Sequence, residues 1–493
     1  MGQLTGFLGI AVFLGLAILL SRSRKAIHWK TVGWALILQW IAALFVLKGV
    51  AIAKFLSFIP WPGLLVSLAT DSQKFYVNFI TEQELLRYYP TALPDHKLFI
   101  GFGWVVVLLM FVPMLLQRFA RYQNKVVSWG IFGVVTYCLL WGNLVGHGFE
   151  KVRAVAESIM RYAADGAQFV FGDLANPAGP AGMVFAFVVL PTIIFIASIF
   201  AILYYLGVMQ WVVGAFARAL NRFLKVSGAE SVCVAASILM GQTEAPLTVR
   251  PYLAGFTRSE LMTIMTAGMA HVSGAIMVAY VQVAHVDIVH LLTAVIMTAP
   301  GAIMMAKIME PETGQPVTAG NVKVDVPIND VNIVDAAARG AGEGMHLAIN
   351  VGGMLVAFIA LVALFNGILV SFHHALTLEN VLGTVFRPFA FLMGVPWGES
   401  KTVGSLLGQR MVVNEFVAFI SLGKITTLSA KAKLISTFAL CGFANFSSIA
   451  IQVGGIGALV PERRGDLARL GLKAMLAGTM ANFLSACIAG ILM

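Results

Sequence analysis

The sequence predicts an all-α integral membrane protein. Of its 493 residues, 59% are hydrophobic and only 11% are charged, whereas about one quarter of the residues in a soluble domain carry a charge. Runs such as 182–205 are apolar on every side, while the strands of an outer-membrane barrel alternate apolar and polar residues. Composition and pattern therefore exclude a soluble enzyme and an outer-membrane barrel.

The apolar runs are long enough to be membrane spans, because a bilayer core takes about 20 apolar residues per helix. We expect about ten transmembrane helices, at residues 4–20, 31–48, 98–117, 128–146, 182–206, 260–282, 289–307, 347–371, 434–456 and 471–491. Residues 149–174 have the pattern of an amphipathic helix that lies at the interface with membrane lipid.

The basic residues give the chain a net charge of +10, and their placement in short loops indicates topology rather than a nucleic acid partner. Clusters such as 22–30 and 218–225 fall on one side, which is predicted to be the cytoplasm. Both termini then face the periplasm of a bacterium, and the chain is a multi-pass protein of the inner membrane. A second group of basic residues opposes this topology because it falls on the outer side: Lys401, Arg410, Lys424, Lys431 and Lys433.

Two stretches are too polar to cross the membrane and too apolar to be solvated loops. Residues 227–253 contain Gly241, Pro246 and Glu244, and residues 398–423 contain Glu415. Irregular backbone at membrane depth is tolerated where it lines a polar cavity. Each stretch therefore predicts a re-entrant hairpin, and the two hairpins enter from opposite faces.

A short motif follows each hairpin at a similar distance along the chain. Residues 268–274 (GMAHVSG) and 442–448 (GFANFSS) share the pattern G-x-A-[HN]-x-S-[GS]. Small and polar residues interrupt an apolar helix at both places, which is typical of an inverted-repeat transporter with unwound helices. The alternative is chance similarity over a short pattern.

The repeat divides the chain into four parts. Residues 1–181 hold the N-terminal helices, an interfacial insertion and the amphipathic helix. The first transport repeat covers 182–309 and the second covers 347–493. Residues 310–346 have the composition of a soluble loop and are predicted to be a cytoplasmic linker.

The hairpin carboxylates are the leading candidates for chemistry. An ionised carboxylate in hydrocarbon costs at least about 3 kcal/mol, so Glu244 and Glu415 must face water, a partner or a ligand. One alternative is structural, with Arg250 or Arg410 as a pairing partner. The other is a hydrogen-bonding pocket for a neutral polar solute, because uncharged polar residues lie close by in the sequence: Gln242, Thr243, Asn414, Asn445 and Ser448.

Three motifs resemble those of the concentrative nucleoside transporters. They are residues 241–247 (GQTEAPL), 414–419 (NEFVAF) and 442–448. The resemblance extends from about Phe185 to the C-terminus, with a weaker match in the first two predicted spans and at 162–166 (YAADG). Roughly residues 50–125 do not match and look like an insertion.

The resemblance implies a homotrimer in which each protomer has a scaffold and a mobile transport domain. Carried over motif by motif, it implies nucleobase contacts for Gln242, Thr243, Glu244 and Phe443, and ribose contacts for Glu415, Asn445 and Ser448. The chemistry agrees, because a carboxylate accepts hydrogen bonds from vicinal hydroxyls and an amide both donates and accepts. For Phe443, ordinary packing is an equal alternative.

The coupling ion is where the chain departs from the sodium-coupled members that it resembles. They have an asparagine and a serine at the positions of Ser237 and His271. An amide oxygen is lost at the first position, and a protonated imidazole at the second repels sodium. We therefore expect proton symport, with Glu244 as the first candidate for the proton carrier and His271 as another. Sodium symport remains the alternative, and no metal or organic cofactor is expected.

These observations predict a proton-driven nucleoside importer that works by an elevator-like movement, not an enzyme. A nucleoside-binding channel or membrane receptor is the alternative from another class. Channels need pore-lining rings and no occluding hairpins, so the two predicted hairpins argue against a channel. An intramembrane hydrolase has little support, because the sequence lacks HExxH and G-x-S-x-G motifs.

Overall fold

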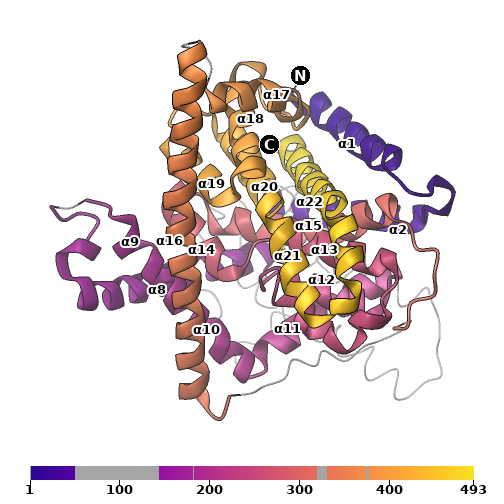
Figure 1. Ribbon diagram of the computed structural model, residues 1–493, viewed down its shortest axis with the longest axis horizontal. Coiled ribbons are helices and arrows are strands. Elements are labelled where there is room, and N and C mark those ends of the chain that lie inside the picture. Colours follow the sequence, from indigo (N-terminus) through magenta and orange to yellow (C-terminus); the bar gives the residue numbers. More distant parts are fainter. Residues whose placement is uncertain (1, 50–143, 181, 319–329, 374–376) are drawn as a thin grey trace, which may run out of the picture. The chain divides into compact units, whose positions relative to one another are not determined.

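The computed structural model describes residues 2–49, 144–180, 182–318, 330–373 and 377–493, and every regular element in these ranges is helical (Figure 1). The elements are, in order, α1 (Gly2–Leu19), η1 (Arg24–Ala26), α2 (Trp29–Leu47), α8 (Leu144–Phe171), η2 (Gly172–Ala175), α9 (Phe185–Val188), α10 (Leu190–Tyr205), α11 (Val208–Leu224), α12 (Gly228–Ser237), η3 (Ala245–Gly255), α13 (Arg258–Ala270), α14 (Gly274–Ala284), α15 (Ile288–Met309), α16 (Ile333–Phe372), α17 (Leu378–Leu392), α18 (Trp397–Val412), α19 (Glu415–Lys424), α20 (Ala430–Leu440), α21 (Phe446–Leu459), η4 (Pro461–Arg463) and α22 (Arg464–Leu492).

The chain forms two compact units, one of residues 1–43 with 152–493 and one of residues 44–151. The second unit is described only at its two ends, in α2 and α8. The functional residues predicted from the sequence all belong to the first unit.

Six helical segments among the described residues are long and apolar enough to cross a membrane: 29–47, 185–205, 258–284, 288–309, 333–372 and 461–492. Each overlaps a predicted span, so these six are confirmed as long apolar helices. The apolar parts of α1 and α21 are shorter. The span predicted at 98–117 lies outside the described residues, as does most of 128–146, whose last residues begin α8. The total of ten spans therefore stays a prediction.

Both predicted hairpins consist of two helical arms joined at a break. Hairpin 1 comprises α12, a turn at 238–244 and η3, whose arms pack together. Pro246 and Pro251 lie in η3, where their missing N–H groups disfavour a regular α-helix. Hairpin 2 comprises α18 and α19, which are joined at Val413 and Asn414. The chain bends by 117° before hairpin 2, and α17 therefore packs back along α18.

Each hairpin is followed by a broken helix and then by a long helix. After hairpin 1, α13 and α14 are separated by residues 271–273, and α15 follows. After hairpin 2, α20 and α21 are separated by residues 441–445, and α22 follows. The interruptions fall in the two predicted motifs, and the order of elements is the same in both halves.

A buried polar network fixes the starts of hairpin 1 and α13. Ser227 with Glu230, and Thr257 with Glu260, form capping boxes that satisfy the first N–H groups of α12 and α13. The Ser227 hydroxyl donates to Glu260 at 2.7 Å, and Lys307 of α15 pairs with Glu230 at 2.5 Å. The network ties hairpin 1 to α13 and α15.

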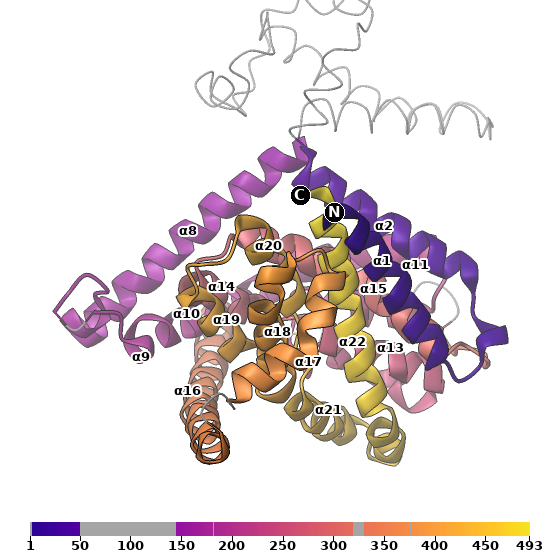
Figure 2. The ribbon, with the colours of Figure 1, turned by 90° about the horizontal axis from the view of Figure 1, so that it is seen from above.

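Burial differs sharply among the long helices. In the most apolar windows of 258–284 and of 461–492, 94% and 89% of the residues are buried, whereas in that of α16 only 6% are. Figure 2 shows α16 nearly end-on at the edge of the first unit, next to α10. The helices that carry the first break and the C-terminus form the core, and α16 leaves most of its apolar surface uncovered within one chain.

The start of α16 corrects one expectation. The sequence predicts a linker over 310–346, but α16 begins at Ile333, capped by the Asn332 side chain, which accepts from the Asp335 N–H. The glycines that suggest a loop instead permit close packing on α10. A Cβ at Gly340 would lie 2.5 Å from that of Ala201, and one at Gly344 would lie 2.7 Å from the Cα of Ile194. Small residues one helical turn apart let two membrane helices approach closely.

Replacing Gly344 by alanine should therefore push α10 and α16 apart. We expect Gly344→Ala to cost about 1–3 kcal/mol, as overpacking of a tight contact does, and to lower the melting temperature of the detergent-purified protein. Gly342→Ala is the matched control, because a Cβ there meets nothing within 4 Å, and alanine stabilises an exposed helical position by roughly 0.5–1 kcal/mol. Equal melting temperatures for the two variants would contradict this packing account.

Candidate functional site

The two helix breaks meet inside the first unit. The N–H of Phe443 in the second break donates to the carbonyl of His271 in the first, at 3.3 Å. A helix that stops leaves carbonyl groups without partners, and Asn482 of α22 supplies donors for both breaks. Its Nδ2 donates to the carbonyls of Ala270 at 2.8 Å and Cys441 at 2.9 Å. One amide therefore joins the ends of α13 and α20.

Glu415 lies at the tip of hairpin 2, at the start of α19, and is only 5% exposed. One of its oxygens accepts from the Tyr280 hydroxyl at 3.0 Å, and the other accepts from Nδ2 of Asn445 at 3.0 Å. Tyr280 comes from α14, where its ring stacks on Phe419 of hairpin 2. The carboxylate is thus held between the two broken helices.

Asn445 is the N-cap of α21, and its Oδ1 accepts from the Ser448 N–H at 2.8 Å. The Ser448 hydroxyl accepts from Nε2 of Gln242, at the tip of hairpin 1, at 3.2 Å. Nε2 of Gln452 then donates to Oε1 of Gln242 at 3.2 Å. These side chains, with Glu415 and Tyr280, form one hydrogen-bonded series that we call the polar chain: Tyr280, Glu415, Asn445, Ser448, Gln242 and Gln452. It connects both hairpins to both broken helices.

A cavity of about 500 Å³ is lined in part by the tip of hairpin 1, and no member of the polar chain lines it. Its volume is within the usual size of a small-molecule site. Glu244 at the tip of hairpin 1 is exposed toward it and accepts from the Gly241 N–H at 3.1 Å. The wall of the cavity comes from α10, hairpin 1, the first break and the start of α16. It includes Phe200, Tyr204, Leu239, Glu244, Thr248, Arg250, Ser273, Asp330, Arg339 and Glu343.

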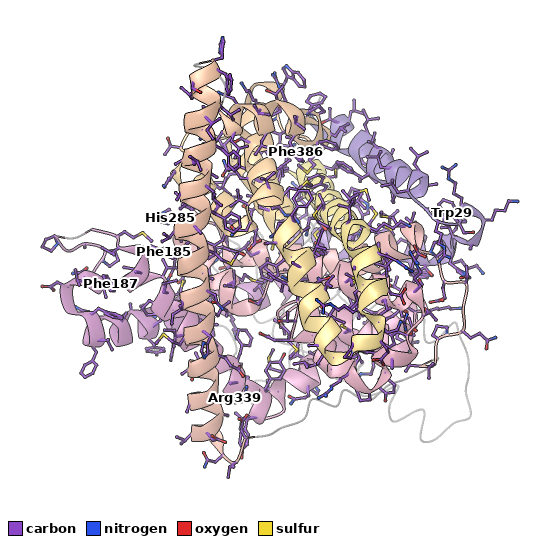
Figure 3. All side chains as sticks on the ribbon, viewed as in Figure 1. Trp29, Phe185, Phe187, His285, Arg339 and Phe386 are labelled. Atoms are coloured by element: carbon purple, nitrogen blue, oxygen red, sulfur yellow. The ribbon has the colours of Figure 1, made fainter. Side chains whose placement is uncertain are left out.

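The α16 side of the cavity carries an ion-pair group. Arg339, near the start of α16 (Figure 3), pairs with Asp330 at 2.7 Å and with Glu343 at 2.8 Å. Glu244 and this ion-pair group therefore line the same cavity. In the described part of the chain no ion pair joins Glu244 to Arg250, which lines the same cavity.

The predicted site residues thus fall into three groups. The structure brings Gln242, Ser448, Asn445 and Glu415 together in the polar chain. Glu244 stands apart from them on the cavity wall. The other four lie elsewhere. Thr243 packs against Gly455 of α21, since a Cβ at Gly455 would lie 2.8 Å from Cγ2 of Thr243. Phe443 is half-buried in the second break, and Ser237 and His271 are each 1% exposed.

The two coupling candidates bond within their own helices. The Ser237 hydroxyl donates to the Cys233 carbonyl at 2.9 Å, and Nδ1 of His271 donates to the Ala267 carbonyl at 2.8 Å. The alternative in which Arg410 pins Glu415 is not what the structure shows. The guanidinium of Arg410 instead donates to the carbonyls of Ala439 and Gly442 and to Asn482.

Sequence reasoning missed three members of this arrangement, namely Tyr280, Gln452 and Asn482. Each is a polar residue inside a predicted span, and such residues mark functional or packing sites in membrane proteins. That signal was available for Gln452 and Asn482. Among the described residues, no group of three or more His, Cys, Asp or Glu side chains is arranged to hold a metal ion.

Comparison with known families matches most of the chain. Residues 290–490 match the model "Na+ dependent nucleoside transporter C-terminus", residues 186–286 match "Nucleoside recognition", and residues 8–61 match "Na+ dependent nucleoside transporter N-terminus". The three matches together contain both hairpins and both helix breaks.

Individual relatives agree with the family match. An uncharacterised transporter of Haemophilus influenzae is 45% identical over 70% of this chain and 86% of its own length. The nucleoside permease NupC of Helicobacter pylori is 40% identical over 70% of this chain and 86% of its own length.

Solved structures match over nearly the whole chain. CNTnw in an inward-facing, substrate-bound state has a TM-score of 0.76 at 35% identity, covering 99% of this chain and 98% of that one. A variant of CNTnw in an outward-facing state has a TM-score of 0.75 at 34% identity, covering 100% of this chain and 98% of that one. With its hairpins, helix breaks and polar chain, this multi-pass membrane protein belongs to the concentrative nucleoside transporter family and is a transporter that works by alternating access, not an enzyme.

Proposed function

We propose that the protein imports nucleosides across the bacterial inner membrane by symport with protons. The observation that carries the proposal is the polar chain, in which hydrogen-bond donors and acceptors from both hairpins are joined in one series. Glu244, two residues from Gln242 of this series, lines a cavity of about 500 Å³. A nucleoside presents hydroxyls on its ribose and both donors and acceptors on its base, so these groups match it chemically.

We assign the ribose to the second repeat and the base to the first. Each Glu415 oxygen has one donor in this structure and can accept a second, so the carboxylate suits the vicinal 2′- and 3′-hydroxyls. Asn445 and Ser448 lie next to it. Gln242, Thr243 and Glu244 at the tip of hairpin 1 would contact the base, with Phe443 near its ring.

The movement proposed is that of an elevator. Residues 182–309 and 347–493 supply the two transport repeats, and residues 1–181 supply scaffold. The hydrogen bonds of the polar chain join both hairpins to the broken helices, so these elements can move as one body. The inward-facing and outward-facing structures of CNTnw support alternating access in this fold.

We further propose a homotrimer in which α16 contributes to the contact between protomers. Its apolar residues are exposed in one chain, for example Val356 at 75% and Leu364 at 58%, and lipid or a second protomer must cover such a surface in a membrane. Native mass spectrometry of the detergent-solubilised protein tests this. A monomer would contradict the assembly and leave α16 facing lipid.

The residues at the two predicted ion-site positions, Ser237 and His271, support proton coupling. Neither position supplies the amide oxygen found in the sodium-coupled members that the chain resembles. His271 has no side-chain oxygen, and Ser237 has a hydroxyl, which donates to the Cys233 carbonyl of its own helix. Glu244 is a carboxylate exposed to the cavity and can take up a proton with the substrate on one side and release it on the other. Sodium is the second candidate, and the family descriptions, which name Na+, favour it.

Uptake of radiolabelled uridine into proteoliposomes separates the two ions. We expect a proton gradient alone to drive accumulation and a sodium gradient alone to drive none. Glu244→Gln should reduce proton-driven accumulation by about tenfold or more, ~1.4 kcal/mol, because an amide cannot carry a proton. Glu157→Gln, the same change at an exposed position of α8 away from the cavity, is the control.

Two outcomes of this experiment would count against the proposal in different ways. Accumulation under sodium alone would show the coupling assignment to be wrong while leaving the nucleoside site in place. If neither gradient drove uptake of uridine, the substrate assignment itself would be wrong.

Removing the hydroxyl that holds Glu415 tests the ribose assignment. We expect Tyr280→Phe to raise the Kd for uridine about tenfold, because a hydrogen bond to a charged group contributes about 1.5–3 kcal/mol and tenfold in Kd is ~1.4 kcal/mol. Isothermal titration calorimetry on purified protein measures it. Tyr252→Phe in η3, outside the polar chain, should leave the Kd unchanged, and an unchanged Kd in Tyr280→Phe would refute the ribose role of Glu415.

A further inference from the structure

Arg410 heads the fully buried side chains by size and is 1% exposed. Its Nη1 donates to the Ala439 carbonyl at 2.7 Å, its Nε to the Gly442 carbonyl at 3.1 Å, and its Nη2 to Oδ1 of Asn482 at 2.5 Å. A buried charge is costly unless partners compensate for it. In the described residues these partners are neutral, so carbonyl dipoles rather than a bonded carboxylate hold the guanidinium.

The position of this charge has a physical reason. The C-terminal end of a helix carries partial negative charge, and two such ends converge here, those of α13 and α20. Asn482 donates to a carbonyl at each end, and its own oxygen accepts from Arg410. Transporters with unwound helices place a bound cation at such carbonyls. In this chain the cation at the second break is tethered to hairpin 2.

The first repeat has no such group of its own. Arg410 lies five residues before Glu415, and the residue five before Glu244 is Leu239. The Leu239 carbonyl accepts from the Gly274 N–H at 3.0 Å, and its side chain brings no charge. The two repeats therefore differ in that only the second carries a fixed cation at the hairpin position equivalent to Arg410.

The second break is tightly packed at Gly442. A Cβ at Gly442 would lie 2.4 Å from Oδ1 of Asn482 and 2.7 Å from the Ala270 carbonyl oxygen. Asn445, in the same break, bonds its N–H to the Phe443 carbonyl at 2.9 Å and its side chain to Glu415. Arg410 thus fixes the segment from which Asn445 reaches Glu415.

We propose that Arg410 is a positioning residue that acts as a built-in cation: with Asn482 it holds the second break so that Glu415, Asn445 and Ser448 can recognise the ribose hydroxyls. The inference rests on the proposed nucleoside function and adds to it the group that orders the ribose side of the site. It predicts that the positive charge of Arg410, and not only its bulk, sets selectivity for those hydroxyls.

The test compares the Kd of uridine with that of 2′,3′-dideoxyuridine in each variant, because a ratio of affinities does not change when a variant is merely less stable. We expect wild type to prefer uridine, and Arg410→Gln to lower that preference about tenfold or more, since sites built to bond a hydroxyl discriminate strongly. Arg410→Lys keeps the charge and should keep most of the preference. Ser485→Ala, one turn along α22 and bonded to Thr298 and Ala481, should match wild type.

Asn482→Asp is the second variant and decides the question if Arg410→Gln does not fold. It preserves shape, cancels the guanidinium charge and loses the two amide donations, so the preference should again fall about tenfold. A preference retained in Arg410→Gln or Asn482→Asp overturns the proposal, even if affinity or melting temperature drops. So does an equal loss in Arg410→Lys and Arg410→Gln, because charge would then not matter. If the wild-type protein binds no uridine, the proposed nucleoside function is wrong. The variants test only the role of Arg410, so the two failures can be told apart.

Discussion

The structure depends on satisfying helix ends inside a membrane. A helix that stops within hydrocarbon leaves carbonyls that no water can reach, and each unpaired group costs several kcal/mol. Here Asn482 and Arg410 supply donors to the ends of α13 and α20. Because those ends are satisfied, the chain can unwind twice at membrane depth, and the unwound segments become the places where polar side chains meet.

The polar chain follows from that solution. Once α21 is capped by Asn445, the cap and the first turn direct Asn445 and Ser448 toward the hairpin tips, and Gln452 follows one turn later. Gln452 reaches Gln242 and the Met265 carbonyl only because residue 268 is glycine, where a Cβ would lie 2.5 Å from its Nε2. Polar groups from two distant parts of the sequence, which we propose bind the substrate, are thereby held in one hydrogen-bonded network.

Local features of this fold were predictable from the sequence, and tertiary partners were not. Glycine, proline and charge within apolar runs locate the hairpins and both helix breaks, because such residues disturb a helix wherever they occur. The partner of Arg410 depends on how α22 packs, and nothing in the sequence near Arg410 points to Asn482. Glycine is also ambiguous by itself: at 340 and 344 it permits close helix packing rather than a loop, and the predicted linker was too long for this reason. The roles of the individual site residues stay predictions.

The two hairpin carboxylates occupy equivalent places in the repeats, yet their surroundings differ. Glu415 is buried and accepts from a tyrosine hydroxyl and an asparagine amide, so its oxygens are fixed in direction. Glu244 is exposed to the cavity and accepts from one backbone N–H. A fixed acceptor suits recognition of hydroxyls, whereas a carboxylate in contact with water can exchange protons during a transport cycle. The asymmetry supports the proposal that the second repeat recognises the ribose and that the first repeat carries the coupling proton. It also agrees with the placement of Arg410. Because the second break already holds a permanent positive charge, the first break is the place where binding of a mobile coupling cation can change the local charge.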